Sequence, residues 1–303
     1  MKVFFVGWSS DYDKVMIDGV REKYFADNIV LPSWLKIVYL VANYFSFHRL
    51  KREVVKTYVR IKLRGSASGD VIICKDSNFF SYIESIEKRD QKKILIVRNT
   101  VGEDFVSEAK CVFDRVYTFD HMQSKKYNIG MLDQVFVYGE GLGTDVQGEG
   151  CFFIGKDKGR ISLVEELSRS FESLGIESKF FVVPDKTSVR HSKLYVNKPM
   201  PYEEVVKAVT NSAIILEINQ EGQSGLTMRA LESIFLSKKL VTNNKEVINY
   251  DFYDPARVFV IENDVFDKEA MRNFVEKEYP PVEEHVLERY SPLSMMDKVL
   301  ENE

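Results

Sequence analysis

The sequence is poor in cysteine and histidine, and it lacks a long uncharged apolar run. Its three cysteines, Cys74, Cys111 and Cys151, are odd in number and scattered, so they predict no disulfide framework and indicate a reducing cytoplasm. Its four histidines show no ligand spacing. No window reaches the roughly 18 apolar residues of a membrane span, and the apolar start MKVFFVGW is too short for a signal peptide. We therefore expect a cytoplasmic protein without a structural metal.

The sequence also lacks a large excess of either positive or negative charge, and it lacks the common phosphate-binding motifs. The formal net charge is −4, which gives no reason to expect a nucleic-acid partner. No glycine loop ends in GKS or GKT, and no GxGxxG follows the first predicted strand. The sequence therefore disfavours a P-loop NTPase and a dinucleotide-binding oxidoreductase.

Apolar runs alternate with helical patterns along the whole chain of 303 residues. The first half has runs at 3–6, 70–74, 93–97 and 114–118, and similar runs recur after residue 150. Strands that alternate with helices form parallel sheets with helices on both faces. We predict an α/β fold with two doubly wound, Rossmann-like domains that face a cleft.

A glycine-rich stretch, Tyr138 to Gly150, fits neither a strand nor a helix and is the predicted linker. It divides the chain into an N-terminal domain, 1–140, and a second domain, 141–290. Residues 291–303 are expected to form a C-terminal helix that crosses back to the first domain.

The most informative stretch runs from Glu217 to Asn244. An apolar run ends in a polar loop with Gly222 and Gly225, then a helical pattern and a second apolar run follow. In such a βαβ unit the helix N-terminus lies at the carboxyl edge of the sheet and favours an anion, most naturally a phosphate. The alternative is an ordinary unit whose glycines only make a tight turn.

The run QSGLTMRALESIFLSKKLVTNN, residues 223–244, resembles the donor-binding loop and helix of GT-B glycosyltransferases. The nearest are the bacterial enzymes of lipopolysaccharide, capsule and exopolysaccharide assembly. FFIGKDKGR at 152–160 and VINYDFY at 247–253 resemble other parts of the same domain, while FDRVYTFD at 113–120 and KKYN at 125–128 are similar to the middle of these enzymes. The resemblance covers the C-terminal half well and the N-terminal half loosely.

This resemblance implies transfer of a sugar from a nucleotide-sugar donor to a saccharide or lipid-linked acceptor, without a metal or another cofactor. The second domain would bind the donor and the first the acceptor. Lys156 or Arg160 would contact phosphate and Glu232 the ribose, while Glu217 and Glu221 compete as the first glutamate of the usual pair. The implied donor-binding residues are Gly155, Lys156, Lys158, Arg160, Gln223, Ser224, Gly225, Leu226, Thr227, Arg229 and Glu232.

An inverting enzyme needs a general base in the first domain. The candidates are Asp11, Asp13, Asp76 and His121, which the sequence does not rank. The structural alternative is that Asp11 and Asp13 cap a helix or lie on its first turn, and that His121 is a structural loop residue. Other polar groups that follow predicted strands, such as Lys75 and Arg98, are candidate acceptor-side residues.

Residues 32–64 begin aromatic and apolar and then turn basic, with seven Lys and Arg against the single Glu53 between 49 and 64. One interpretation is a core helix followed by a solvated helix. The other is a patch, Trp34 to Arg64, that contacts the anionic inner face of the cytoplasmic membrane.

Two further functions stay open for a chain with this fold. A sugar-nucleotide epimerase would turn over the donor without an acceptor. A non-catalytic partner would bind nucleotide without turnover.

Overall fold

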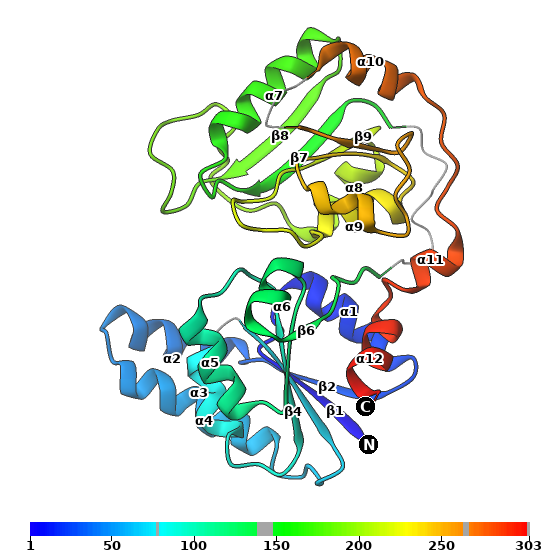
Figure 1. The fold of residues 1–303 in the computed structure, drawn as a ribbon. Helices are drawn as coiled ribbons and strands as arrows, with labels where there is room; N and C mark the ends of the chain where they lie inside the picture. The colour runs from blue at the N-terminus through cyan, green and yellow to red at the C-terminus, as the bar shows by residue number, and fades with distance from the viewer. Residues whose placement is uncertain (77–78, 138–147, 263–266, 302–303) are drawn as a thin grey trace. The chain divides into compact units, whose positions relative to one another are not determined.

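The computed structural model describes residues 1–76, 79–137, 148–262 and 267–301, which belong to two compact units (Figure 1). Unit 1 comprises Met1–Leu132 and Pro292–Glu303, and unit 2 comprises Asp133–Ser291. Each unit has its own parallel sheet with helices on both faces. This confirms the predicted α/β class with two doubly wound sheets. Residues 138–147 of the predicted linker lie outside the described residues.

Within the described residues, the sheet of unit 1 has six parallel strands in the order β2-β1-β3-β4-β5-β6. The strands are β1 (Lys2–Val6), β2 (Phe25–Ile29), β3 (Val71–Lys75), β4 (Lys92–Val97), β5 (Arg115–Thr118) and β6 (Gly130–Met131). The helices are α1 (Asp11–Arg21), α2 (Ser33–Tyr44), α3 (His48–Lys62), α4 (Phe79–Ile86), α5 (Glu103–Val112), α6 (His121–Tyr127) and α12 (Pro292–Leu300).

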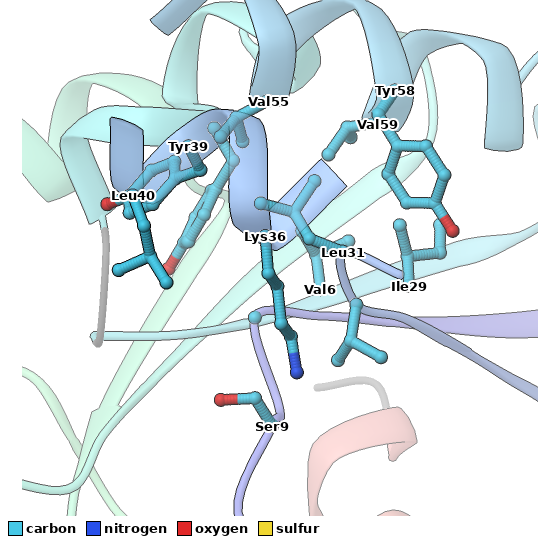
Figure 2. Close-up of a pocket in the computed structure, with 13 residues that line it drawn as sticks. Val6, Ser9, Ile29, Leu31, Lys36, Tyr39, Leu40, Val55, Tyr58 and Val59 are labelled. Carbon is cyan, nitrogen blue, oxygen red and sulfur yellow. The ribbon is translucent and has the colours of Figure 1, made fainter. Parts of the chain in front are cut away.

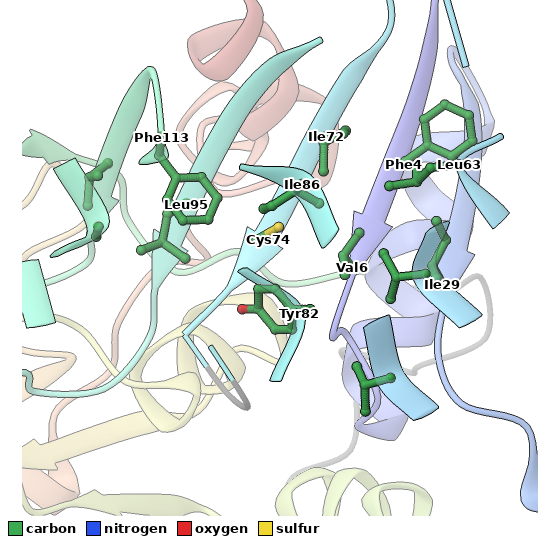
Figure 3. Packing of buried hydrophobic residues seen from close by; sticks show 14 of the residues in the cluster. Phe4, Val6, Ile29, Leu63, Ile72, Cys74, Tyr82, Ile86, Leu95 and Phe113 are labelled. Carbon is green, nitrogen blue, oxygen red and sulfur yellow. The ribbon is translucent and has the colours of Figure 1, made fainter. Parts of the chain in front are cut away.

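Side-chain alternation along the strands gives unit 1 two apolar faces. Phe4 and Val6 point to the face that α3, α4 and α5 cover, where they join Ile72 and Leu95 in one buried cluster (Figure 3). Helices α1 and α12 pack against each other, and Asp297 accepts hydrogen bonds from Lys23 and Tyr24 at 2.9 and 2.8 Å. The last helix of the chain is therefore part of unit 1.

Unit 1 departs from the sequence-based expectation at three elements. The strands β2 and β6 were not predicted, because FADNI at the sheet edge has neither a continuous apolar run nor a strict alternation, and β6 has only two residues. The interpretation of 32–47 as a core helix is wrong, because Ala42 is the one residue of α2 that is buried. Most of its apolar side chains instead lie at the surface, while Leu35 and Tyr39 are half-buried.

The sheet of unit 2 has five parallel strands among the described residues, in the order β11-β10-β9-β7-β8. The strands are β7 (Cys151–Lys156), β8 (Ser178–Val183), β9 (Ile214–Glu217), β10 (Lys239–Thr242) and β11 (Val258–Val260). The helices are α7 (Ile161–Ser173), α8 (Tyr202–Thr210), α9 (Met228–Phe235), α10 (Lys268–Glu276) and α11 (Glu284–Glu288), with a 3-10 turn at Lys245–Asn249.

The two faces of this sheet also bury different helices. Phe153 and Leu216 pack in one cluster with α7 and α10, whereas Phe152 and Ile215 pack with α8 on the other face. Because all strands are parallel, their carboxyl ends meet at one edge of the sheet. The loops after β7, β9 and β10 therefore open at a common edge.

Candidate functional site

The loop after β9 is organised by the buried carboxylate of Glu217. It accepts hydrogen bonds from the backbone N–H and the hydroxyl of Thr227, at 3.0 and 2.6 Å, and from the hydroxyl of Thr242 at 2.7 Å. One side chain thus joins the end of β9, the start of α9 and the end of β10. Burial raises the pKa of Glu217. Glu221, the competing glutamate, is exposed in the same loop.

The start of α9 lies close to its predicted place. Thr227 is the N-cap residue, and its hydroxyl accepts from the backbone N–H of Arg229 at 3.1 Å. Ser224, Gly225 and Leu226 are buried just before it, and the amide of Asn219 donates to the Gly225 carbonyl at 3.2 Å. The structure therefore brings the predicted residues 223–227 together in one ordered turn at a helix N-terminus.

The loop after β7 is built around the buried Asp157. Its carboxylate accepts from the backbone N–H of Ile161 at 3.0 Å, from the hydroxyl of Ser188 at 2.7 Å and from the hydroxyl of Tyr195. Lys158 and Gly159 both have positive φ, at 48° and 79°, which turns the chain back toward α7. Neutral donors therefore satisfy Asp157, and no cation of the loop pairs with it.

Arg160 joins the two loops. Its guanidinium donates to the carbonyls of Lys156 and Asp157, at 2.5 and 3.1 Å, and to the carbonyl of Ile218 just beyond β9. A Cβ at Gly155 would lie 3.1 Å from this guanidinium, so glycine gives the arginine room. Burial lowers the pKa of Arg160, but three of its five N–H groups have carbonyl acceptors. Two N–H groups are left for a ligand.

Lys156 and Lys158 supply the remaining positive charge. Across residues 148–262 and the other described ranges, no ion pair joins Lys156, Lys158 or Arg160 to a carboxylate. Burial lowers the pKa of Lys158, and the neighbouring cations Arg160 and Lys156 lower it further. Cations that repel one another in this way favour a bound polyanion.

Arg229 and Glu232 form an ion pair on α9. The carboxylate is fully buried, and burial raises the pKa of Glu232 to about 7 although Arg229 opposes the rise. Glu232 has no exposed surface, so contact with a ribose would require neighbouring atoms to move. Its ribose role stays a prediction.

A second cluster of charges lies at the carboxyl edge of the sheet in unit 1. Asp13 is fully buried, and its carboxylate accepts from the amine of Lys75 at 2.8 Å and from the backbone N–H of Ser10 at 3.0 Å. Arg98 follows β4 and lies 3.5 Å from the same carboxylate. Two cations from neighbouring strands therefore neutralise one aspartate.

Aromatic rings cover these cations. The Lys75 amine lies 4.9 Å from the ring centre of Tyr12 and 5.6 Å from that of Trp8, and the Arg98 guanidinium lies 4.8 Å from Tyr12. Burial alone would raise the pKa of Tyr12, but Arg98 and Lys75 lower it below the usual value. Ion pairs and cation–π contacts hold this cluster together.

The four base candidates have different environments. Asp11 is exposed and pairs with Lys14 at 2.8 Å, whereas Asp13 belongs to the cluster just described. His121 is half-buried at the start of α6. Asp76 is half-buried just after β3, where one oxygen accepts from Asn99 at 2.7 Å and the other has no hydrogen-bond partner among the described residues.

The sequence did not reveal the pairing of Lys75 and Arg98 with Asp13 or the role of Asp157. A usable signal exists, because Lys75 and Arg98 are charged residues that directly end apolar strands. The part of the chain that the structure describes holds no group of three or more His, Cys, Asp or Glu arranged for a metal ion. None of its helices is long and apolar enough to span a bilayer.

Neither a family model nor a curated protein sequence matches this chain. Solved structures do match over nearly the full length. The glycosyltransferase AviGT4 of avilamycin A biosynthesis shares 11% identity at a TM-score of 0.59, over 99% of this chain and 96% of that one. A UDP-forming α,α-trehalose-phosphate synthase from Burkholderia vietnamiensis shares 10% identity at a TM-score of 0.56, over 98% and 96%.

An E. coli structure titled trehalose-6-phosphate, bound with UDP-2-fluoro glucose, shares 10% identity at a TM-score of 0.55, over 99% and 95% of the two chains. At 10–11% identity, the similarity to these structures shows a shared backbone fold. The chain therefore has the two-sheet GT-B fold.

Proposed function

We propose that this chain is a glycosyltransferase that takes its sugar from a nucleotide-sugar donor. The observation that carries the proposal is the carboxyl edge of unit 2, where no ion pair joins the side chains of Lys156, Lys158 and Arg160 to a carboxylate among the described residues. Asp185 lies beside these cations and accepts from the backbone N–H of Lys158 at 3.1 Å, so they keep an excess of positive charge over one nearby carboxylate. The N-terminus of α9 opens at the same edge. Backbone N–H groups at a helix start and nearby cations together favour a diphosphate.

Sugar transfer breaks the bond between the anomeric carbon and a diphosphate oxygen, and negative charge develops on the leaving group. In this proposal Lys156 and Lys158 neutralise that charge, and Arg160 offers its two remaining N–H groups. Solved structures of this fold include a UDP-forming synthase and a complex with a UDP-sugar analogue, which supports a nucleotide-sugar donor. The chemistry proposed for unit 2 needs no metal.

The acceptor proposed from the sequence resemblance is a saccharide or lipid-linked saccharide of surface-polysaccharide assembly. If the reaction inverts the anomeric carbon, the acceptor hydroxyl must give its proton to a base. Asp76 suits this role best of the four candidates, because it follows a strand end and one of its oxygens, which is buried, has no described hydrogen-bond partner that an acceptor hydroxyl would have to displace. Asp13 suits it least, because Lys75 and Arg98 already bind its carboxylate.

The test begins with a thermal-shift screen of nucleoside diphosphates and nucleotide sugars to identify the donor. Donor consumption is then measured with and without saccharide acceptors for the parent, Asp76→Asn and the control Asp11→Asn. We expect Asp76→Asn to lower kcat by roughly 10²- to 10⁴-fold with little change in donor affinity, and Asp11→Asn to stay near the parent.

The other outcomes identify the other functions. Donor isomerisation without an acceptor would indicate an epimerase. Donor binding without turnover under any condition would indicate a non-catalytic partner, and the absence of any nucleotide binding would contradict the proposal.

Membrane-surface contact through α2 and α3 is a further part of the proposal. Trp34, Ile37 and Tyr44 are 65%, 63% and 82% exposed, and Arg49 lies on the adjoining helix with its charge in solvent. An exposed apolar helix beside basic residues suits an anionic lipid surface. Lys56 contributes less than the sequence suggested, because it pairs with Glu53 and Glu84 at 3.0 and 3.1 Å.

A further inference from the structure

Unit 1 contains a cavity of about 280 Å³ between the sheet edge and the helices α2 and α3 (Figure 2). Its floor comes from the ends of β1 and β2, and its walls come from α2, α3 and one residue of α4. This volume lies near the lower limit of small-molecule sites, which usually hold one ligand or one segment of a larger ligand.

The wall of the cavity is almost entirely apolar. Val6, Ile29, Leu31, Leu40 and Val59 supply aliphatic surface, and tyrosine rings supply more. Figure 2 shows the long side chain of Lys36 extending past these residues, and Ser9 also lines the cavity. Lys36 forms no ion pair with any carboxylate in the described part of the chain. The cavity therefore combines an apolar chamber with one cation at its margin.

One wall of the cavity is the helix that exposes its apolar side chains. Leu40 lines the cavity and is nevertheless 63% exposed, and Ala42 is the one buried residue of α2. An apolar chain that enters the cavity would thus stay in contact with apolar surface from the outside of α2 to the floor at β1. A purely polar ligand would gain little from this wall.

The cavity also borders the charged edge of the sheet. Gly7 and Ser9 line it, and the next residue, Ser10, contacts both Asp13 and Lys75. A polar group attached to a chain in the cavity would therefore lie beside the strand ends that carry Lys75 and Asp76. These are the strand ends at which the proposed function puts the acceptor.

We propose that this cavity binds the hydrocarbon segment of an amphiphilic acceptor whose anionic group contacts Lys36. That the bound amphiphile is the sugar acceptor rests on the proposed function, whereas the binding of an alkyl anion in the cavity does not. Most of the affinity comes from the hydrocarbon segment of the ligand, since the wall offers aliphatic surface and a single cation.

The test titrates the full chain by calorimetry with alkyl phosphates from butyl to dodecyl, kept below their micelle concentrations, and with inorganic phosphate. We expect affinity to rise on the order of three- to fourfold for each methylene that enters the cavity, and then to level off when the cavity is full. Inorganic phosphate should bind at least a hundredfold more weakly than decyl phosphate. Affinity that does not depend on chain length would overturn the proposal.

Two variants assign the effect to the cavity. Leu31→Trp fills it, and Leu40→Asp adds a carboxylate to its wall at an exposed position that tolerates the change. Each should weaken decyl phosphate binding more than tenfold, whereas the controls Leu50→Trp and Ile61→Asp, exposed positions outside the lining, should stay within twofold. If Leu31→Trp fails to fold, the Leu40→Asp variant alone tests whether the alkyl phosphate binds in the cavity.

Parent-like binding in Leu40→Asp would place the alkyl phosphate elsewhere and contradict the proposal. Nucleotide binding by the same samples is measured in parallel. If the parent binds nucleotide but its affinity for alkyl phosphates does not depend on chain length, the cavity proposal alone is rejected. If the parent shows the chain-length effect but binds no nucleotide, the proposed donor site alone is rejected.

Discussion

Each of the two sheets has a buried aspartate at its carboxyl edge, and the two carboxylates are bound by different kinds of group. In unit 1, Asp13 is neutralised by Lys75 and Arg98, so these two cations are committed to the protein itself. In unit 2, Asp157 is satisfied by two hydroxyls and a backbone N–H. The side chains of Lys156 and Lys158 beside it form no ion pair with a described carboxylate, although Asp185 accepts from the backbone N–H of Lys158 and lies near both.

The difference shows why a count of charges does not locate a ligand site. Each edge combines basic and acidic side chains. Whether a cation there can bind an added anion depends on whether a carboxylate of the protein already binds it. Where a carboxylate already binds the cations, an added phosphate must displace it, which leaves a buried charge without a partner. Where neutral donors satisfy the carboxylate, a phosphate adds new charge-assisted hydrogen bonds.

The largest expected effect comes from breaking the ion pairs of unit 1. Lys75→Met leaves Asp13 buried with Arg98 as its one cation among the described residues, and we expect a loss of about 3–5 kcal/mol in the free energy of unfolding. Chemical denaturation of the variant beside Lys156→Met measures it. The Lys156→Met control, at an exposed position, should stay within about 0.5 kcal/mol of the parent. Equal stabilities would mean that Asp13 does not depend on its cations.

A second comparison concerns Glu232, a buried carboxylate of unit 2 with Arg229 as its cation. Burial raises its pKa from 4.5 to about 7. Its contribution to stability is therefore fully present below pH 4.5 and is lost as the pH rises through 7. The difference of 2.5 between these pKa values corresponds to roughly 3 kcal/mol.

The variant Glu232→Gln cannot ionise and should lack this pH dependence. Unfolding free energies of parent and variant, measured from pH 5 to pH 8, should therefore diverge in favour of the variant as the pH rises. A constant difference across the range would show that Glu232 stays ionised throughout. If Glu232 also contacts ribose, the variant will bind nucleoside diphosphate more weakly and pyrophosphate unchanged.

Removing a neutral partner should cost less than removing a cation. Thr227→Val deletes the hydroxyl that donates to Glu217 and caps α9, so we expect a loss of about 1–2 kcal/mol. Thermal unfolding compares it with Thr57→Val, an exposed threonine on α3. A loss of unfolding free energy as large as that of Lys75→Met would show that neutral donors and cations stabilise the two edges equally.

The smallest effect is expected at the surface of unit 1. Arg49→Ala removes one exposed cation beside the apolar α2, and such a charge contributes about 1 kcal/mol near anionic lipid. Co-sedimentation with phosphatidylserine-containing liposomes should weaken about fivefold, and high salt should reduce the difference. Binding that neither the substitution nor salt changes would exclude an electrostatic contribution.

The sequence predicted the fold well where apolar runs are continuous. The strands β7, β9 and β10 and the helix α9 have strong patterns, and each is present in the structure. The strand β2 was missed because its polar residues lie at a sheet edge, and α2 was ambiguous because apolar composition does not distinguish a core helix from an exposed one.

The contacts of the site were harder to predict than its residues. Lys75 meets Asp13 across 62 residues, and Thr242 meets Glu217 across 25. Such contacts depend on which strands lie side by side, and an order such as β2-β1-β3 is not written in any local pattern. The sequence could therefore name Asp13, Lys156 and Arg160 as candidates but could not show which charges are already paired.

The most direct test of the account is calorimetric titration with the nucleoside diphosphate that the thermal-shift screen selects. The double variant Lys156→Met/Lys158→Met is compared with the parent and with whatever fraction of Lys75→Met remains folded. Charge-assisted contacts to phosphate contribute about 1.5–3 kcal/mol each, so the double variant should bind at least about a hundredfold more weakly. Folded Lys75→Met should bind like the parent. Parent-like affinity in the double variant, or a loss confined to Lys75→Met, would contradict the assignment of the donor site to unit 2.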